Sequence, residues 1–265
     1  MSRLDGRVAI IVGAGQTHGE TVGNGRATAV TFARSGARLV LVDRDAVTLE
    51  ETATLARAEG VEVVTVVADV ATDDGPDRIV AEAVEAFGGI DILHNNVGIG
   101  AGDGPPHHLA DDAYDRIMDV NLRAMWRTCR AVVPVLRTSE HGAIVNVSSL
   151  ASIAAAGNLT AYKLSKAGVN ALTQNLALTN AKHGVRANAI LPGFIDTPMA
   201  VDAAARALDT DRASVAAARA SAVPLGRQGT AWDVANAALF LASDDAAFIT
   251  GVLLLVDGGQ GARVG

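Results

Sequence analysis

Residues 8–27 read VAIIVGAGQTHGETVGNGRA, and this stretch carries the strongest signal about the fold. A short β-branched run, Val8–Val12, leads directly into glycines and then into a helical pattern. Glycines after a first strand allow a tight turn and let backbone N–H groups approach a pyrophosphate at the positive end of the helix. The stretch therefore predicts a strand–turn–helix unit that binds a dinucleotide. Residues 16–22 separate Gly15 from Gly23, so the glycine-rich stretch is longer than a compact dinucleotide-binding fingerprint. The alternative interpretation is therefore a flexible surface loop.

Outward from this unit, short apolar runs alternate with longer helical patterns along the whole chain. Near-continuous apolar strands between helices are typical of a parallel sheet covered on both faces. Right-handed crossovers then predict an α/β, single-domain Rossmann-type fold over residues 1–265, a doubly wound parallel sheet of about seven strands. The expected strands are Val8–Val12, Ala37–Val42, Val61–Val67, Ile90–His94, Ala143–Val147, Arg186–Ile190 and Val252–Val256. The expected helices lie near 25–35, 45–59, 73–87, 111–138, 160–182 and 231–243.

The segment 193–229 is the least regular part of the second half of the chain, and it contains an Ala-rich helical stretch at 200–222. It stands between the sixth expected strand and the last expected helix. Because open α/β sheets bind ligands at the carboxyl ends of their strands, we expect this segment to form a substrate lid over that edge.

Composition restricts the classes of protein to which the chain can belong. Hydrophobic residues make up 49% of the 265 positions and charged residues 19%, so a large core can be buried. Aromatic residues make up only 3% and the net charge is −7, which argues against a nucleic-acid-binding surface. The sequence shows no signal peptide and no membrane-length apolar run. We therefore expect a cytoplasmic protein that binds neither nucleic acid nor a membrane.

Residues that bind metals or form disulfides are scarce. Cys129 is the only cysteine, which excludes an intramolecular disulfide and a thiolate zinc site. Its position in a helical pattern favours a small buried hydrophobe over a nucleophile. His107 and His108 are adjacent, but no third ligand stands at a suitable spacing. A polar loop tip is the better interpretation of this pair, and no metal is expected.

Ser149, Tyr162 and Lys166 form the candidate proton-transfer site. Tyr162 and Lys166 are four residues apart in a helical pattern, so an ammonium can lie beside a phenol on one helix face. A fixed cation favours the phenolate and lowers the phenol pKa from its ordinary value of about 10. The Ser149 hydroxyl, after the preceding strand, would hold a substrate oxygen against that phenol. The alternative is a chance pair on a solvated helix face, although one of only two tyrosines stands here.

Asp43 ends the second expected strand, eighteen positions after Gly25. Dinucleotide-binding folds place at this position the acid that bonds the adenosine ribose. A carboxylate there would repel a 2′-phosphate, so we expect NAD (NADH) rather than NADP as the cofactor. Arg44 is the counter-argument, because it could turn to bind a phosphate. The other interpretation of Asp43 is a plain strand-end cap.

Further polar residues and glycines follow the third and fourth expected strands. Asp69-Val70 could cradle adenine, and Asn95-Asn96-Val97-Gly98 comes directly after the fourth strand. Side-chain amides there can tie neighbouring strand ends together, while Gly98 allows close approach to the cofactor. Asn121 lies inside a helical pattern, and a buried amide needs partners. A helix break that holds a water is the sharper explanation of this residue.

Together these motifs closely resemble the short-chain dehydrogenase/reductase family in its compact single-domain form, and the resemblance covers essentially the whole chain. It implies that Tyr162 is the general acid/base and that Lys166 binds the nicotinamide ribose and depresses the tyrosine pKa. It also implies that Ser149 orients the substrate oxygen and that Asn121 holds a water in a proton relay from Lys166. Ser148 is the competing hydroxyl, but the spacing to Tyr162 favours Ser149.

The resemblance further implies a cofactor site that runs from the glycine turn to the lid. The expected catalytic residues are Asn121, Ser149, Tyr162 and Lys166. The expected cofactor-binding residues are Gly13, Gly15, Gly23, Asn24, Gly25, Asp43, Arg44, Asp69, Val70, Asn95, Val97, Gly98, Tyr162, Lys166, Pro192, Gly193, Ile195 and Thr197. Of these, Ile195 and Thr197 would meet the nicotinamide carboxamide.

The chain departs from the family pattern in two places. The usual turn is Gly-x-x-x-Gly-x-Gly, whereas residues 16–22 make this turn six residues longer. The extra residues either wall the pyrophosphate or form an inert bulge. Val97 replaces the usual Ala, which is a small packing change.

We therefore expect an NAD-dependent oxidoreductase (EC 1.1.1.-) that interconverts a secondary alcohol and a ketone by hydride transfer. The expected pocket walls at 99–110, at 150–159 and in the lid carry few charges, which favours a mostly apolar small molecule as substrate. One alternative is a catalytically silent dinucleotide-binding regulator or scaffold, and the intact set of candidate catalytic residues argues against it. Another is an epimerase or dehydratase with the same cofactor, which usually has a separate carboxyl-terminal domain.

Apolar side chains extend over more of the expected 111–138 and 160–182 helices than one sheet face can cover. Contiguous apolar surface usually marks an interface, and two-fold pairs of such helices close into a tetramer. The resemblance implies the same, so we expect a homotetramer. The residues concerned are Ala131, Val132, Leu136, Val169, Leu172, Leu176 and Leu178, with the carboxyl-terminal run Ile249–Val256.

Overall fold

The computed structural model describes residues 2–155 and 157–262, and it contains a seven-stranded, fully parallel sheet. One residue of the expected 150–159 pocket wall, residue 156, lies outside the described residues. The strand order is β3-β2-β1-β4-β5-β6-β9. The chain adds β2 and β3 on one side of β1 and the later strands on its other side, so the sheet is doubly wound. The strands are β1 Val8–Val12, β2 Arg38–Asp43, β3 Val63–Val67, β4 Ile92–Asn95, β5 Ala143–Val147, β6 Arg186–Pro192 and β9 Leu253–Val256. The predicted fold class is confirmed, with strand ends shifted by up to two residues.

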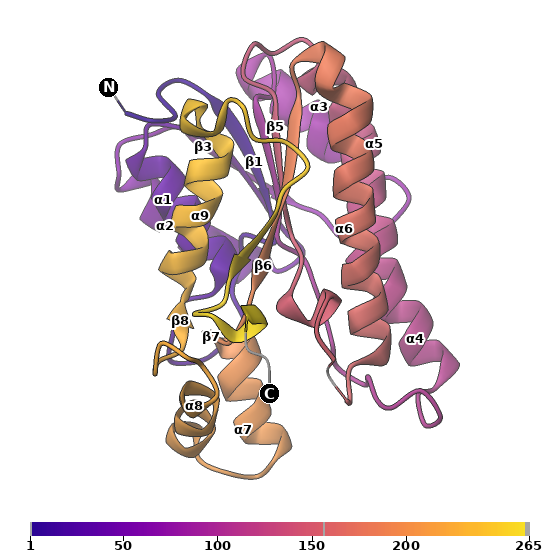
Figure 1. Ribbon diagram of the computed structural model, residues 1–265. Helices are drawn as coiled ribbons and strands as arrows, with labels where there is room; N and C mark the ends of the chain where they lie inside the picture. The colour runs from indigo at the N-terminus through magenta and orange to yellow at the C-terminus, as the bar shows by residue number, and fades with distance from the viewer. Residues whose placement is uncertain (1, 156, 263–265) are drawn as a thin grey trace.

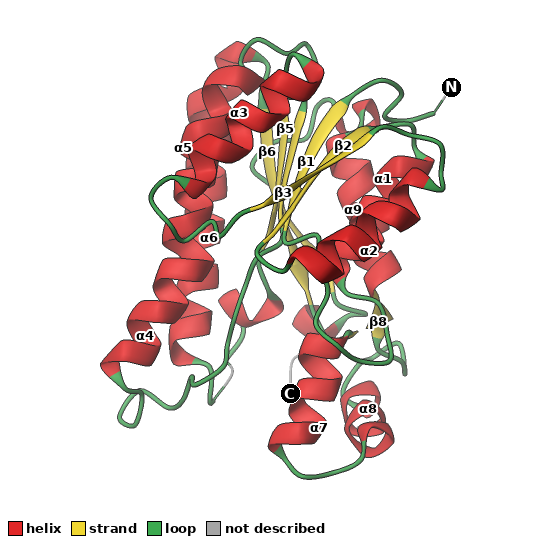
Figure 2. Cartoon of the chain, turned by 180° about the vertical axis from the view of Figure 1, so that it is seen from behind, coloured by secondary structure: helices red, strands yellow, loops and turns green. Residues whose placement is uncertain are grey.

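Helices cover both faces of the sheet (Figures 1 and 2). On one face lie α1 Asn24–Arg34, α2 Ala46–Arg57 and α9 Ala231–Ala242; on the other lie α3 Gly75–Phe87, α5 Ala124–Leu136 and α6 Thr160–Asn180. Each face has its own apolar core, with Phe32 and Leu49 in the first and Ile79 and Cys129 in the second. Burial of each Phe, Leu or Ile side chain in these cores contributes roughly 1.5–3 kcal/mol. Among the described residues, no helix is long and apolar enough to cross a bilayer.

The expected helix at 111–138 is interrupted. It consists of α4 Asp111–Met118, a π-helical turn over Asp119–Arg123, and α5. A π turn inserts one extra residue into the helical ladder and commonly occurs at functional sites. Asn121 lies in the middle of this turn and is fully buried, so the break expected from the sequence is present at the expected residue.

The lid does not contain one continuous helix over 200–222, and this prediction is wrong. A π turn over Pro198–Asp202 leads into α7 Ala203–Ala207, and α8 Arg212–Ser221 follows after a reversal. Asp209 adopts a left-handed conformation with φ of 48°, which ends the first helix. Asp211 then starts α8, since its carboxylate accepts the Ser214 N–H at 2.8 Å.

A two-stranded parallel ribbon joins the two ends of the lid. β7 Ile195–Asp196 pairs with β8 Gly229–Thr230, and Thr230 begins α9 with a capping box shared with Asp233. The lid is therefore fixed at its base while α7 and α8 project beyond the carboxyl ends of the strands (Figure 1).

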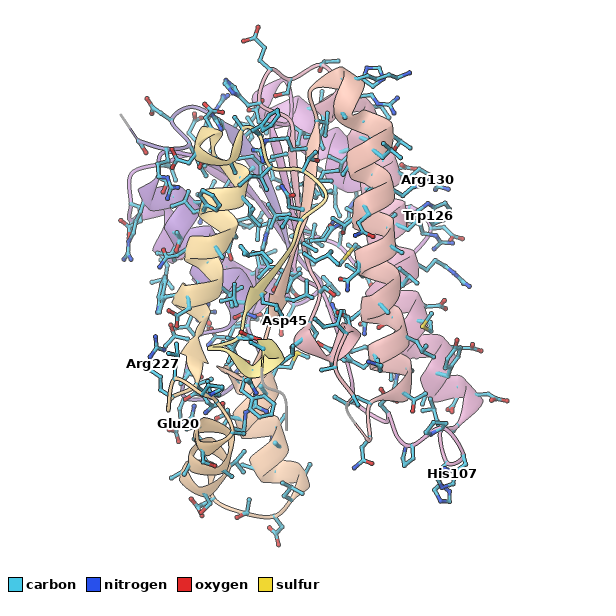
Figure 3. All side chains as sticks on the ribbon, viewed as in Figure 1. Glu20, Asp45, His107, Trp126, Arg130 and Arg227 are labelled. Atoms are coloured by element: carbon cyan, nitrogen blue, oxygen red, sulfur yellow. The ribbon has the colours of Figure 1, made fainter. Side chains whose placement is uncertain are left out.

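The apolar residues expected at a subunit interface divide into two groups. Val132, Leu136 and Val169 are buried in the core of the chain itself, so they do not contribute to its surface. Leu178 is 81% exposed on α6. Trp126, which was not among the expected residues, lies on the outer side of α5 and is 44% exposed (Figure 3). The sequence pattern did not distinguish the apolar residues of these helices that pack in the core from those that are exposed.

Candidate functional site

A cavity of about 490 Å³ lies at the carboxyl edge of the sheet, between the glycine turn and the lid. Its walls include most of the residues expected to hold a cofactor or substrate. Those that line it are Gly13, Gly15, Gly23, Asn24, Gly25, Asp43, Arg44, Asp69, Val70, Val97, Gly98, Ser149, Tyr162, Lys166, Pro192, Gly193, Ile195 and Thr197. Asn95 and Asn121 do not line it. Residues Gln16, Thr17 and His18 of the extended turn do, so the extension is part of the cavity wall rather than an inert bulge.

The glycine turn brings backbone close to backbone. Gly13 has φ of 78°, which favours glycine, and its N–H donates to the Val42 carbonyl at 2.8 Å. A side chain at Gly25 would overlap the Gly13 carbonyl group. Gly23 precedes α1 without a side-chain cap, and Gly23, Asn24 and Gly25 line the cavity at the positive end of this helix. This arrangement suits the phosphates of a dinucleotide.

Asp43 lies where β2 ends, with its carboxylate beside the glycine turn. It accepts hydrogen bonds from the Gly15 N–H at 2.9 Å and the Asp45 N–H at 3.1 Å. A Cβ at Gly15 would come within 2.8 Å of this carboxylate. The residue therefore places a negative charge in the cavity wall and also fixes the turn, while Arg44 next to it lines the same wall.

Of the polar residues at the ends of β3 and β4, some line the cavity and others bond only within the fold. Asp69 accepts the Ala71 N–H at 2.9 Å, which shapes the turn that brings Val70 to the cavity. Asn95 is buried away from the cavity and donates to Asn146 Oδ1 at 2.9 Å, so it ties β4 to β5. The amide at the cavity is that of Asn96, which donates to the Gly13 carbonyl at 3.2 Å. Asn95, expected from the sequence to bind the cofactor, therefore does not line the cavity, whereas the next residue, Asn96, does.

Lys166 is a buried cation in the cavity wall. It is 2% exposed, and its ammonium donates to the Val147 carbonyl at 2.9 Å and to the Val97 carbonyl at 3.5 Å. Its Nζ atom lies 5.8 Å from the centre of the Tyr162 ring. Burial lowers the pKa of the Lys166 ammonium to about 8.

The Tyr162 phenol does not have the lowered pKa that the sequence predicted. Burial raises the pKa of this phenol, and the hydrogen bond with the Ser149 hydroxyl opposes the rise. The pKa of the phenol is raised even though the Lys166 ammonium, which two backbone carbonyls hold, lies close to the ring. In the described structure Tyr162 is thus held as a neutral phenol.

The two adjacent serines have separate roles. Ser148 is 2% exposed and donates to the backbone carbonyl of Lys166 at 3.0 Å, so its hydroxyl supports the helix. Ser149 accepts the Ala151 N–H at 3.1 Å and bonds the Tyr162 phenol. Of the two hydroxyls, that of Ser149 is the one joined to the phenol.

Asn121 holds together two segments that border the cavity. Its carboxamide accepts the Ile99 N–H at 2.7 Å and donates to the Ile99 carbonyl at 2.9 Å. It also donates to the Ser165 hydroxyl at 3.1 Å, on the helix that carries Tyr162. The amide therefore has protein partners on both its oxygen and its nitrogen.

Two residues of the site were not foreseen. Asp103 accepts the backbone N–H groups of Ala161 at 3.0 Å and of Tyr162 at 2.8 Å, and so caps α6 from a distant loop. Arg219, on α8, lines the cavity and places its guanidinium 4.2 Å from the centre of the Phe194 ring. Neither has a sequence signal, because Asp103 is far from α6 along the chain and Arg219 lies in an Ala-rich helix.

Other candidates lie outside the site. The rings of His107 and His108 lie 4.2 Å apart between their centres, tilted by 46°, in an exposed loop, in which Figure 3 labels His107. Cys129 is fully buried, and burial raises the pKa of its thiol to about 12. Within residues 2–155 and 157–262, no group of three or more His, Cys, Asp or Glu side chains is arranged to hold a metal ion.

Comparisons with known proteins agree with this geometry. A family model described as "Enoyl-(Acyl carrier protein) reductase" matches residues 20–260. Levodione reductase of Leifsonia aquatica is 37% identical over 98% of this chain and 96% of that protein. A Burkholderia xenovorans protein assigned to the short-chain dehydrogenases/reductases has a crystal structure that superposes with a TM-score of 0.94, at 38% identity over 100% of both chains.

A further similar structure is that of carveol dehydrogenase from Mycobacterium avium in complex with NAD. Its TM-score is 0.91 at 31% identity, and the match covers 99% of this chain and 100% of that one. The relatives and the family model cover nearly the full length of the chain. The protein belongs to the short-chain dehydrogenase/reductase family of oxidoreductases.

Proposed function

We propose that the chain is an NAD-dependent oxidoreductase of a single catalytic domain that interconverts a secondary alcohol and a ketone, with Tyr162 as general acid/base. One observation carries the proposal. The Tyr162 phenol, the Ser149 hydroxyl and the Lys166 ammonium meet in a cavity whose other end is a glycine turn at a helix N-terminus. A nicotinamide dinucleotide fits this arrangement, because one end suits phosphates and the other carries groups that move a proton.

The turn and Asp43 would bind the adenosine half of the cofactor, and Lys166 would bind the nicotinamide ribose. A lysine ammonium has three donors, and carbonyls of Val147 and Val97 use two of them. Among the described residues no other group accepts the third donor, which would bind a ribose hydroxyl. Ile195 and Thr197, at the start of the lid, line the wall where the carboxamide would lie.

In the proposed reaction, the chain's own residues transfer a proton to or from the substrate oxygen. The cofactor, when bound, supplies or accepts a hydride at the carbinol carbon. Ser149 would hold the substrate oxygen beside the Tyr162 phenol, and the phenol would donate its proton to that oxygen in reduction or receive it in oxidation. The phenol is protonated and so has a proton to donate, and the Lys166 charge would stabilise the phenolate that remains.

NAD is the proposed cofactor because the Asp43 carboxylate would repel a 2′-phosphate. The NAD-bound neighbour, carveol dehydrogenase, supports the same assignment. The substrate is proposed to be a mostly apolar small molecule, since Ile99 and Met199 contribute apolar wall. Levodione reductase and carveol dehydrogenase, by name, act on small carbonyl or alcohol compounds.

The experiment that tests the proposal is a panel of secondary alcohols (alicyclic, aromatic, steroid, sugar and hydroxyacyl) assayed with NAD and NADP by absorbance of the reduced cofactor. Turnover of at least one alcohol with NAD supports the proposal. Tight binding of NADH, measured by fluorescence, with no turnover of any alcohol or ketone would instead favour a silent dinucleotide-binding regulator. Failure to bind either dinucleotide would contradict both.

A further inference from the structure

Residues 16–22, the extension of the glycine turn, contact the lid through Gly19, Glu20 and Thr21. Gln16 closes the base of this extension, because its side-chain carbonyl accepts the Gly23 N–H at 3.1 Å. At its tip, a Cβ at Gly19 would come within 2.7 Å of Pro198 and Asp202, both in the lid. Glu20, next in sequence, lies beside the lid in Figure 3. Its backbone N–H donates to Asp202 Oδ1 at 3.2 Å.

One cation joins the extension to the lid. Arg212 pairs with Asp196 and, at 3.4 Å, with Asp202, and both carboxylates belong to the lid. Its guanidinium also lies 3.4 Å from the Thr21 hydroxyl and 3.8 Å from the Glu20 carboxylate. The Thr21 hydroxyl in turn donates to Asp196 at 3.4 Å. We name these five residues the loop–lid cluster: Glu20, Thr21, Asp196, Asp202 and Arg212.

The charges of the loop–lid cluster make Arg212 its central member. Three carboxylates surround one guanidinium, and Asp202 and Arg212 have side chains that are only 10% and 20% exposed. Arg212 is the first residue of α8, where the helix dipole disfavours a cation. The carboxylates therefore account for its position. Without the guanidinium, the Glu20 carboxylate of the extension would meet Asp196 and Asp202 of the lid as like charges, which would favour separation of the two segments.

Both of the joined segments contribute to the cavity wall. Gln16, Thr17 and His18 line it from the turn, and Pro198 and Met199 line it from the lid. A ligand that enters or leaves between them requires the segments to part. Closing elements of this kind commonly set the rate of ligand release.

We propose that Arg212 is a positioning residue that fastens the extension 16–22 to the lid and thereby slows the release of a bound dinucleotide. The inference rests on the proposed dinucleotide site. It gives the long glycine turn a function that the usual, shorter turn lacks. It also predicts that release depends on ionic strength, because salt weakens the partly exposed ion pairs.

The test compares wild type with Arg212→Gln, Arg212→Lys and Thr21→Val, and uses Arg206→Gln, an exposed lid arginine outside the cluster, as the matched control. Release of NADH is followed by stopped-flow fluorescence during displacement by excess NAD. We expect Arg212→Gln to raise koff about tenfold, Thr21→Val to raise it less, and Arg212→Lys to fall between Arg212→Gln and wild type. The single-turnover rate at saturating cofactor should stay within about twofold of wild type.

A second readout needs no cofactor. Hydrogen exchange of the amides in 16–22 should accelerate in cofactor-free Arg212→Gln and not in Arg206→Gln. Unchanged koff and unchanged exchange in folded Arg212→Gln would overturn the inference, and Thr21→Val serves the same test if Arg212→Gln does not fold. A wild type that binds neither NADH nor NADPH would instead contradict the proposed dinucleotide site.

Discussion

The carboxylate of Asp103 accepts the backbone N–H of Tyr162 at 2.8 Å, across 59 positions of sequence. The same carboxylate accepts the N–H groups of Ala161 and Gly104. The loop after β4 therefore supplies the cap that α6 lacks locally, and it fixes the first turn of the helix on which the phenol is carried.

Replacing Asp103 with Ala should weaken this fixation. We expect a loss of about 0.5–2 kcal/mol of stability, as for other helix caps, and a several-fold lower kcat with little change in NADH affinity. Urea unfolding and steady-state kinetics measure the two effects. Asp115→Ala, an exposed acid on α4, is the control and should change neither. An unchanged kcat in Asp103→Ala would show that capping of α6 by Asp103 does not contribute to catalysis.

Asp43 should decide between the two cofactors. Wild-type kcat/KM with NAD should exceed that with NADP by well over tenfold, which is about 1.4 kcal/mol or more. Asp43→Ala should narrow this gap, and it should also weaken binding of both cofactors because the carboxylate fixes the Gly15 N–H. Equal use of NAD and NADP by the wild type would assign control of the site to Arg44.

His94 should make the fold sensitive to acid. It is fully buried in β4 against Phe32, and neither ring nitrogen has a hydrogen-bond partner among the described residues. Burial lowers the pKa of its imidazole to about 3 from 6.5. The unfolded chain therefore binds more protons between these values, so the contribution of neutral His94 is fully present above pH 6.5 and is lost as the pH falls towards 3.

Between pH 7.5 and pH 5 this loss amounts to about 2 kcal/mol. His94→Leu should remove that part of the pH dependence, as measured by urea unfolding at both pH values. His183→Gln, at an exposed histidine, should retain it. The same loss of stability in His94→Leu and in wild type would show that other groups cause the acid sensitivity.

We expect exposed apolar side chains to form the contacts between subunits. Trp126, Leu178 and Phe248 are 44%, 81% and 104% exposed. We expect a homotetramer, so light scattering at micromolar protein should give close to four times 27.0 kDa. Leu178→Asp should lower the mass. A wild type that stays monomeric would contradict this proposal.

Local patterns in the sequence predicted the parallel sheet, because each strand and helix has its own apolar periodicity. The break around Asn121 was also predictable, since a buried amide in a helix needs partners. The reversal at Asp209 was not, because the Ala-rich residues on both sides favour helix and only the left-handed turn separates them.

Contacts between distant segments escaped prediction for a different reason. The raised pKa of Tyr162 depends on its burial in the folded chain, and Lys166 is held by the carbonyls of Val147, in β5, and of Val97, in the loop after β4. Whether Asn95 or Asn96 lines the cavity depends on the residue at which β4 ends, because successive side chains point to opposite faces of a strand. A shift of one residue reverses which amide reaches the cavity.

The most direct test of the central claim is the turnover of Tyr162→Phe, measured on the best alcohol of the panel together with its NADH affinity. The phenylalanine keeps the ring and removes the proton carrier. We predict a rate at least about 100-fold below wild type, the usual scale of general acid/base catalysis, with NADH affinity nearly unchanged. Retention of more than about a tenth of wild-type turnover would contradict the assignment of Tyr162 as the acid/base.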